Sequence, residues 1–161
     1  MKQKRIFLVV MVIVLALSAL LPAVSAAQAE LPEVLVTADW LEANLEDPNV
    51  RVIEVSVIPG VFERGHIPGA VNFVWHTDFV ETVSRDIVSA NRFQELVQAA
   101  GINDDSTIVL YGDNNNWFAA WGAWIFNIYG FEDVRLLDGG RVKWEADGRP
   151  LSVTAEAPAA G

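Results

Sequence analysis

The sequence predicts a single α/β domain, built on a parallel β-sheet with helices on both faces. Short segments rich in β-branched residues alternate with helical patterns along the chain, which is the order typical of such a fold. One segment, TIVLY at 107–111, is an unbroken apolar run, as expected for a central parallel strand that is covered on both sides. About 132 residues follow position 29, enough for one domain with its own core.

The first half of the domain is predicted to run strand, helix, strand. Residues 33–36 form a short strand, and Thr37 is placed to cap a helix in which Leu41 and Leu45 share one face. The Asp-Pro-Asn sequence at 47–49 ends this helix before a second strand at 51–55. A glycine- and proline-containing turn then precedes a short apolar segment at 70–74.

The second half contains the clearest amphipathic helix. Apolar residues recur there at the helical spacing i, i+3, i+4, i+7: Phe93, Leu96, Val97 and Ala100. Asn91, with Gln94 three residues later, resembles a capping box, and Gly101 supplies a C-terminal stop. A helix at 117–129 is apolar nearly all round, so we expect it to be buried. A strand at 134–137 and one more helical turn complete the domain.

The first 29 residues are predicted to be a cleaved secretory signal. Three basic residues precede an apolar run at 6–21, which is followed by Pro22 and small residues, with cleavage after Ala26 or Ala29. The alternative is a retained anchor, but 16 apolar residues are short for a bilayer span, which needs about 20. We therefore expect an exported protein, in the periplasm or outside the cell, with no stable membrane insertion after cleavage.

Composition excludes several classes of function. After cleavage, 8 basic and 21 acidic residues leave a charge of −13, which disfavours nucleic acid and anionic membranes as partners. The chain has no Cys, so it has no disulfide, no thiolate metal site and no thiol catalysis. His66 and His76 are the only two histidines and lack metal-binding spacing, so no metal and no cofactor are predicted.

Three motifs in the same order resemble those of the rhodanese sulfurtransferases. They are GHIPGAVN at 65–72, an apolar strand with a six-residue loop at 112–117, and VRLLDGGRVKW at 134–144. The resemblance implies a rhodanese domain at 30–151, followed by a linker-like tail at 152–161. The segments ERGHIPGAVNFVWHTDF, RDIV and YGDNNNWFAAW are most similar to the non-catalytic amino-terminal domain of two-domain thiosulfate sulfurtransferases.

The resemblance also identifies the equivalent of the active-site loop. It comprises Gly112, Asp113, Asn114, Asn115, Asn116 and Trp117. Active rhodanese domains carry a Cys as the first loop residue, and its thiolate holds the transferred sulfur as a persulfide. Gly112 occupies that position here, and glycine is neither a nucleophile nor a covalent carrier. We therefore expect no catalytic residue in this chain.

The function implied is that of a structural half-enzyme, inactive alone. A Cys-bearing rhodanese domain would be its partner in moving sulfane sulfur from thiosulfate to a thiophilic acceptor. The alternative is a stand-alone anion- or protein-binding regulatory module, in which the loop amides hold a weakly bound anion. The donor, the acceptor, the oligomeric state and whether Gly161 is a natural end or a truncation before a second domain stay open.

Other conspicuous residues are expected to be structural. His66 would tie down the turn around it, and His76 would bond locally to Asp78. Core filling is the expectation for Trp117, Trp121 and Trp124, with a domain interface as the alternative.

Overall fold

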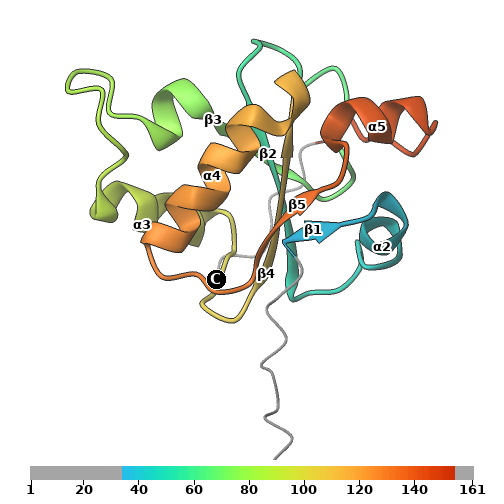
Figure 1. Cartoon of the computed structure of the whole chain (residues 1–161), viewed down its shortest axis with the longest axis horizontal. Coiled ribbons are helices and arrows are strands. Elements are labelled where there is room, and N and C mark those ends of the chain that lie inside the picture. The colour runs from blue at the N-terminus through green and yellow to red at the C-terminus, as the bar shows by residue number, and fades with distance from the viewer. Residues whose placement is uncertain (1–33, 155–161) are drawn as a thin grey trace, which may run out of the picture. The chain divides into compact units, whose positions relative to one another are not determined.

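The computed structural model describes residues 34–154, which form a five-stranded, fully parallel sheet in the order β1-β5-β4-β2-β3 (Figure 1). The strands are β1 (Leu35–Val36), β2 (Val50–Ser56), β3 (Val71–Val74), β4 (Thr107–Gly112) and β5 (Val134–Leu137). The predicted signal segment at 1–29 lies outside the described residues, as does the tail beyond position 154.

The helices cover both faces of the sheet, as predicted. They are α2 (Ala38–Ala43), α3 (Ala90–Ala99), α4 (Trp117–Ile128) and α5 (Gly140–Ala146), together with a π-helical turn η1 (Trp75–Phe79) and a short 3₁₀ turn η2 (Asn114–Asn116). In Figure 1, α3 and α4 lie on one side of the strands and α2 and α5 on the other. The predicted α/β class and parallel sheet are confirmed.

The central strand β4 divides the core into two halves. Ile108 and Leu110 point to the side of α3 and α4, whereas Val109 and Tyr111 point to the side of α2 and α5. All four side chains are fully buried. Successive side chains of a strand point to opposite faces, so an unbroken apolar run here serves both helix layers.

One of the two predicted helix N-caps is confirmed. Thr37 caps α2 as expected, since its Oγ1 accepts a hydrogen bond from Trp40 N at 3.1 Å. The prediction of Asn91 as a cap is wrong, because α3 begins at Ala90 and its N-cap is Ser89, in extended conformation. Ser and Asn are equally good N-caps, so the sequence alone did not distinguish them.

The chain after α5 returns to the body of the domain. His66 and Ser152 form an antiparallel bridge with two backbone hydrogen bonds of 2.8 Å. The first residues of the predicted tail are thus paired with the turn at 65–69.

Candidate functional site

The loop 112–117 lies at the carboxyl end of β4, between the central strand and α4. β4 pairs with β2 on one side and with β5 on the other, so the loop stands above the middle of the sheet. Ligands of open parallel sheets bind at this edge. The structure therefore places all six predicted loop residues in one segment at the position where chemistry is expected.

Gly112 has no room for a side chain. It pairs with Val55 of β2, and a Cβ atom added to it would lie 2.5 Å from the Val55 carbonyl oxygen. Real Cβ atoms essentially never come closer than 3.0 Å to such an atom. Any larger residue at position 112 therefore requires the backbones of β2 and β4 to move apart.

Three consecutive asparagines give the loop its shape. Asn114, Asn115 and Asn116 have φ angles of 53°, 56° and 62°, which place all three in the left-handed region. Asn tolerates this conformation better than most residues with a side chain. The loop therefore turns tightly enough to enter α4 directly at Trp117.

Two polar side chains of the loop form hydrogen bonds within the domain. Asn116 accepts from Gly112 N at 3.1 Å through Oδ1 and donates to Leu137 O at 2.6 Å through Nδ2. The carboxylate of Asp113, which is buried, accepts from Val57 N and from Ile58 N, the latter at 2.8 Å. These contacts join the ends of β4, β5 and β2, so the polar groups of both residues are structural.

The exposed side of α4 carries large apolar side chains next to this loop. Its members, called here the tryptophan ridge, are Trp117, Trp121, Trp124 and Ile128, with exposed fractions of 76%, 37%, 49% and 43%. Core filling by the three tryptophans, and burial of the whole helix, were therefore wrong expectations. One side of α4 packs on the sheet, through Ala119, Gly122, Ile125 and Phe126, and its other side is left uncovered by the described residues.

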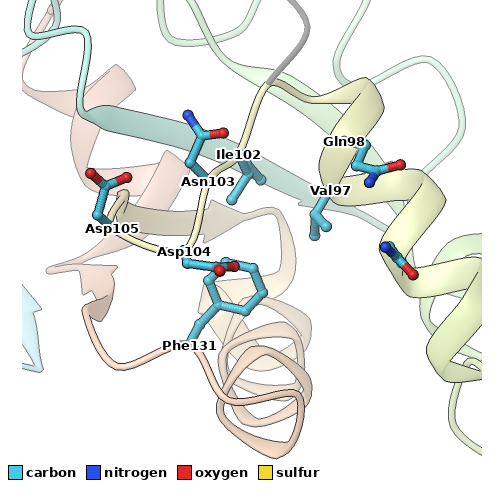
Figure 2. Close-up of a pocket in the computed structure, with 8 residues that line it drawn as sticks. Val97, Gln98, Ile102, Asn103, Asp104, Asp105 and Phe131 are labelled. Carbon is cyan, nitrogen blue, oxygen red and sulfur yellow. The ribbon is translucent and has the colours of Figure 1, made fainter.

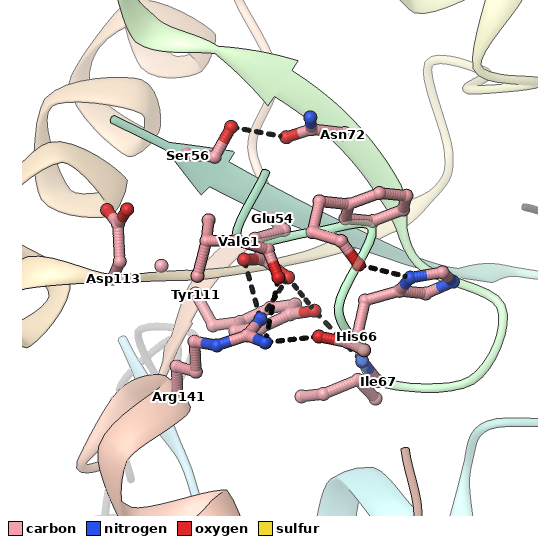
Figure 3. Close-up of polar contacts among 12 residues, drawn as sticks. Glu54, Ser56, Val61, His66, Ile67, Asn72, Tyr111, Asp113 and Arg141 are labelled. Carbon is pink, nitrogen blue, oxygen red and sulfur yellow. Dashed lines mark hydrogen bonds and ion pairs between the residues drawn. The ribbon is translucent and has the colours of Figure 1, made fainter. Parts of the chain in front are cut away.

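A buried polar network lies beneath the loop and was not predicted (Figure 3). It consists of Glu54 of β2, Tyr111 of β4 and Arg141 of α5. Arg141 Nη1 donates to Glu54 Oε1 and Oε2 at 2.7 and 2.8 Å, and Tyr111 OH donates to Glu54 Oε2 at 2.5 Å. Arg141 Nη2 donates to the carbonyl oxygens of Val61 and Gly65.

The protonation of this network follows from its burial. Burial raises the pKa of Glu54 above its usual value, and the hydrogen bond from Tyr111 and the charge of Arg141 oppose that rise. Burial and the neighbouring Glu54 carboxylate raise the pKa of Tyr111 well above its usual range. Tyr111 therefore stays protonated, donating to Glu54 while accepting from Ile67 N at 3.0 Å.

Only one of the two histidines makes the contacts predicted for it. His66 is buried, stacks on Phe62 at 3.8 Å and bonds through Nδ1 to the Phe62 carbonyl oxygen at 3.0 Å, which is the expected structural role. His76 is exposed. Asp78 accepts from Val74 N at 2.7 Å, in place of the predicted local bond to His76.

Cavities occur at both edges of the sheet. One of about 450 Å³ lies at the amino-terminal edge, between the end of α3 and residues 103–105 (Figure 2). Another of about 300 Å³ lies at the carboxyl edge beside Ser56 and Asn72, whose side chains share a hydrogen bond of 2.7 Å. Within residues 34–154, no group of three or more acidic or histidine side chains is arranged to hold a metal, and no helix is long and apolar enough to cross a membrane.

Comparison with known proteins identifies the domain. A family model described as the rhodanese-like domain matches residues 37–147. The chain belongs to the rhodanese family. The match includes the loop, the tryptophan ridge and the buried polar network, so the predicted family is confirmed.

Relatives within the rhodanese family are sulfurtransferases and a sulfur carrier. A putative thiosulfate sulfurtransferase 1 of Mycobacterium bovis is 52% identical over 120 residues, which are 74% of this chain and 43% of that protein. The sulfur carrier protein TtuD of Thermus thermophilus is 50% identical over 127 residues, covering 79% of this chain and 44% of TtuD. The chain thus spans less than half the length of these relatives.

A solved structure supports the same fold. SseA of Escherichia coli, a 3-mercaptopyruvate sulfotransferase, matches with a TM-score of 0.72 and 27% sequence identity, over 80% of this chain and 53% of SseA. This rhodanese-fold match agrees with the single α/β domain described above.

Proposed function

We propose that this chain is an exported, non-catalytic rhodanese domain that serves as the structural half of a sulfurtransferase. The enzyme as a whole would move sulfane sulfur from thiosulfate to a thiophilic acceptor such as cyanide or a thiol. The observation that carries the proposal is Gly112, which stands where the resemblance expects the sulfur-carrying Cys and has no space for a side chain.

Neighbouring residues do not supply the missing chemistry. Asp113 is the nearest carboxylate, but both its oxygens accept backbone hydrogen bonds from the segment after β2. A carboxylate also repels thiosulfate and forms no persulfide. Sulfur transfer therefore needs a thiolate from another domain.

The tryptophan ridge supports a second rhodanese domain as the partner. Trp117 is the last residue of the loop and the first of α4, so a domain packed on the ridge would bring its own Cys-bearing loop to the same edge of the sheet. Inter-domain interfaces commonly bury about 600 to 1,500 Å², and tryptophans are frequent anchors of such interfaces. The greater length of the curated relatives agrees with a partner of this kind.

The proposal is tested by an activity assay and a binding assay in parallel. The purified protein alone should form no thiocyanate from thiosulfate and cyanide above a buffer blank. Sedimentation should show it binding a separately produced Cys-bearing rhodanese domain. Trp117→Ala should weaken this binding, whereas the matched control Val142→Ala, which truncates a 57% exposed side chain on α5, should not.

Two results would contradict the proposal. Turnover by the chain alone would show that the loop is catalytic. Failure of the chain to bind the Cys-bearing domain would favour the stand-alone binding module instead. Export is tested separately by the intact mass of secreted protein, which should lack residues up to position 26 or 29.

A further inference from the structure

The cavity at the amino-terminal edge of the sheet has an apolar floor and a polar rim (Figure 2). Its floor is formed by Val97 and Ile102, which are buried, and by the partly buried ring of Phe131. The rim carries amide and carboxylate side chains: Gln94, Gln98, Asn103, Asp104 and Asp105. Cavities of about 300 to 1,000 Å³ that combine an apolar lining with a few polar groups are typical ligand sites. This cavity, of about 450 Å³, has that size and that kind of lining.

The side chains of the floor converge on one space. In Figure 2, Val97, Ile102 and Phe131 point toward one another across the cavity. The Asp104 carboxylate extends to the same side as the Phe131 ring. Edge-to-face contacts with two neighbouring phenylalanines, at 5.2 and 6.1 Å between ring centroids, hold that ring in place. An aromatic ring near a carboxylate suits an organic cation, because both groups attract positive charge.

Two helices end beside this cavity, and neither has a compensating cation at its end. α3 ends at Ala99, directly after Gln98 of the rim. α4 ends at Ile128, shortly before Phe131 of the floor. The C-terminal end of a helix carries a partial negative charge, which basic residues of the last turn commonly offset. The last turns of α3 and α4 contain no basic residue, so the negative potential at this edge does not depend on the carboxylates alone.

The carboxylates of the rim are not neutralised within the described part of the chain. Asp104 and Asp105 form the tip of a tight turn. Its ends are joined because Ser106 N donates to Asn103 O and Asn103 N donates to Ser106 Oγ, both at 3.0 Å. Neither carboxylate forms an ion pair or a side-chain hydrogen bond with any residue from 34 to 154. No arginine or lysine lines the cavity, so a cation that enters it meets acceptors and no competing positive charge.

We propose that this cavity binds a primary ammonium group carried on a short hydrocarbon chain. The hydrocarbon chain would lie on the apolar floor, and the ammonium group would lie between Asp104 and the Phe131 ring. The amide oxygens of Gln94 and Gln98 are acceptors for its other N–H groups. Such an ammonium group occurs in free amines and in lysine side chains, so both sources are tested. The site includes no residue of the loop 112–117 and does not rest on the proposed function.

Butylammonium chloride is the probe, and the NMR signals of the Gln98 side-chain amide, identified by their loss in Gln98→Met, report on its binding. The probe should shift these signals saturably at constant ionic strength, with sodium chloride as the reference salt. Butanol, which has a similar shape without the charge, should bind about threefold to fivefold more weakly. N-acetyl-lysine amide is titrated in parallel. Saturable binding of either ammonium compound supports the site, and the tighter of the two shows whether the ligand is a free amine or the lysine of a partner.

Two variants separate binding at the cavity from net charge and from folding. Asp104→Asn should weaken butylammonium binding about threefold to fivefold, as loss of a partly screened ion pair implies. Glu132→Gln removes the same charge from a residue next to Phe131 that does not line the cavity, so it should bind the probe like the unmodified protein. Both variants should unfold at the temperature of the unmodified protein, because neither carboxylate has a partner among residues 34–154. Signals that follow sodium chloride or butanol as strongly as butylammonium, or equal affinities of the two variants, would overturn the proposal.

Discussion

Gly112→Cys is expected to give a less stable protein that still transfers no sulfur. The Cβ atom of the new residue would start 2.5 Å from Val55 O, so β2 and β4 must separate by about half an ångström to reach the shortest tolerated contact. These two strands are paired at the centre of the sheet, with Val55 opposite Gly112. Overpacking of this kind costs about 1–3 kcal/mol.

Gly112→Ala is the matched control, because it adds the same Cβ atom without sulfur. Urea denaturation should give both variants a similar loss in the free energy of unfolding. The thiocyanate assay should then find no turnover with either, since a Cys at this position lacks both space and a vacant loop around it. Turnover by Gly112→Cys, or full stability of both variants, would refute the reasoning.

Three further predictions test the network and the loop. Arg141→Met should cost about 3–5 kcal/mol in urea denaturation, because it leaves Glu54 buried without its cation, and adding Glu54→Gln should recover part of the loss. A hydrogen bond from a neighbouring arginine lowers the pKa of Asp133. The stability that Asp133 adds is therefore present above its unfolded pKa of about 3.8 and is lost as pH falls through the lowered value. Asp133→Asn should destabilise the protein at pH 7 and have a progressively smaller effect as the pH falls below 3.8. Asn116→Gly should lower the free energy of unfolding by about 1–3 kcal/mol, because it removes two hydrogen bonds. Asn115→Gly relieves the same left-handed backbone conformation without losing those bonds, so it should change the free energy of unfolding by less than about 1 kcal/mol.

Local patterns were sufficient to predict the sheet and the position of the loop. Alternation of apolar strands with helical segments, and the buried run ending at Tyr111, depend on neighbours in sequence and are visible without a structure. The tight turn through the asparagines likewise depends on local chemistry, because Asn is among the few residues that accept a left-handed backbone.

The buried polar network depends on contacts that sequence spacing does not reveal. Tyr111 and Arg141 lie 57 and 87 residues from Glu54 along the chain. One feature of the sequence pointed to the network: Glu54 lies between the apolar residues Ile53 and Val55 of β2, and a buried carboxylate must find a partner. The identity of that partner required the fold.

The exposure of the tryptophan ridge could not be predicted from the sequence either. The apolar composition of α4 indicates that most of its surface avoids water, but it does not say what covers each side. Within residues 34–154 the sheet takes only the side that contains Gly122, where an added Cβ atom would lie 2.9 Å from Leu110 Cδ2. The side with Trp117 and Trp124 is left exposed by these residues, as the proposed partner domain requires.

The residues around Gly112 leave no room at this position for a side chain or for a ligand on its amide. Asn116 Oδ1 occupies the space above Gly140, where a Cβ atom would lie only 2.1 Å from it, and the same oxygen accepts from Gly112 N. A side chain at position 112 would require β2 and β4 to move apart. A ligand bound to the Gly112 N–H group would have to displace the Asn116 side chain. Displacement of Asn116 would in turn leave the Leu137 carbonyl oxygen without its hydrogen-bond donor. The three positions are therefore coupled, which fits the proposed function, in which this edge of the sheet would contribute a fixed shape and a partner domain would supply the reacting sulfur atom.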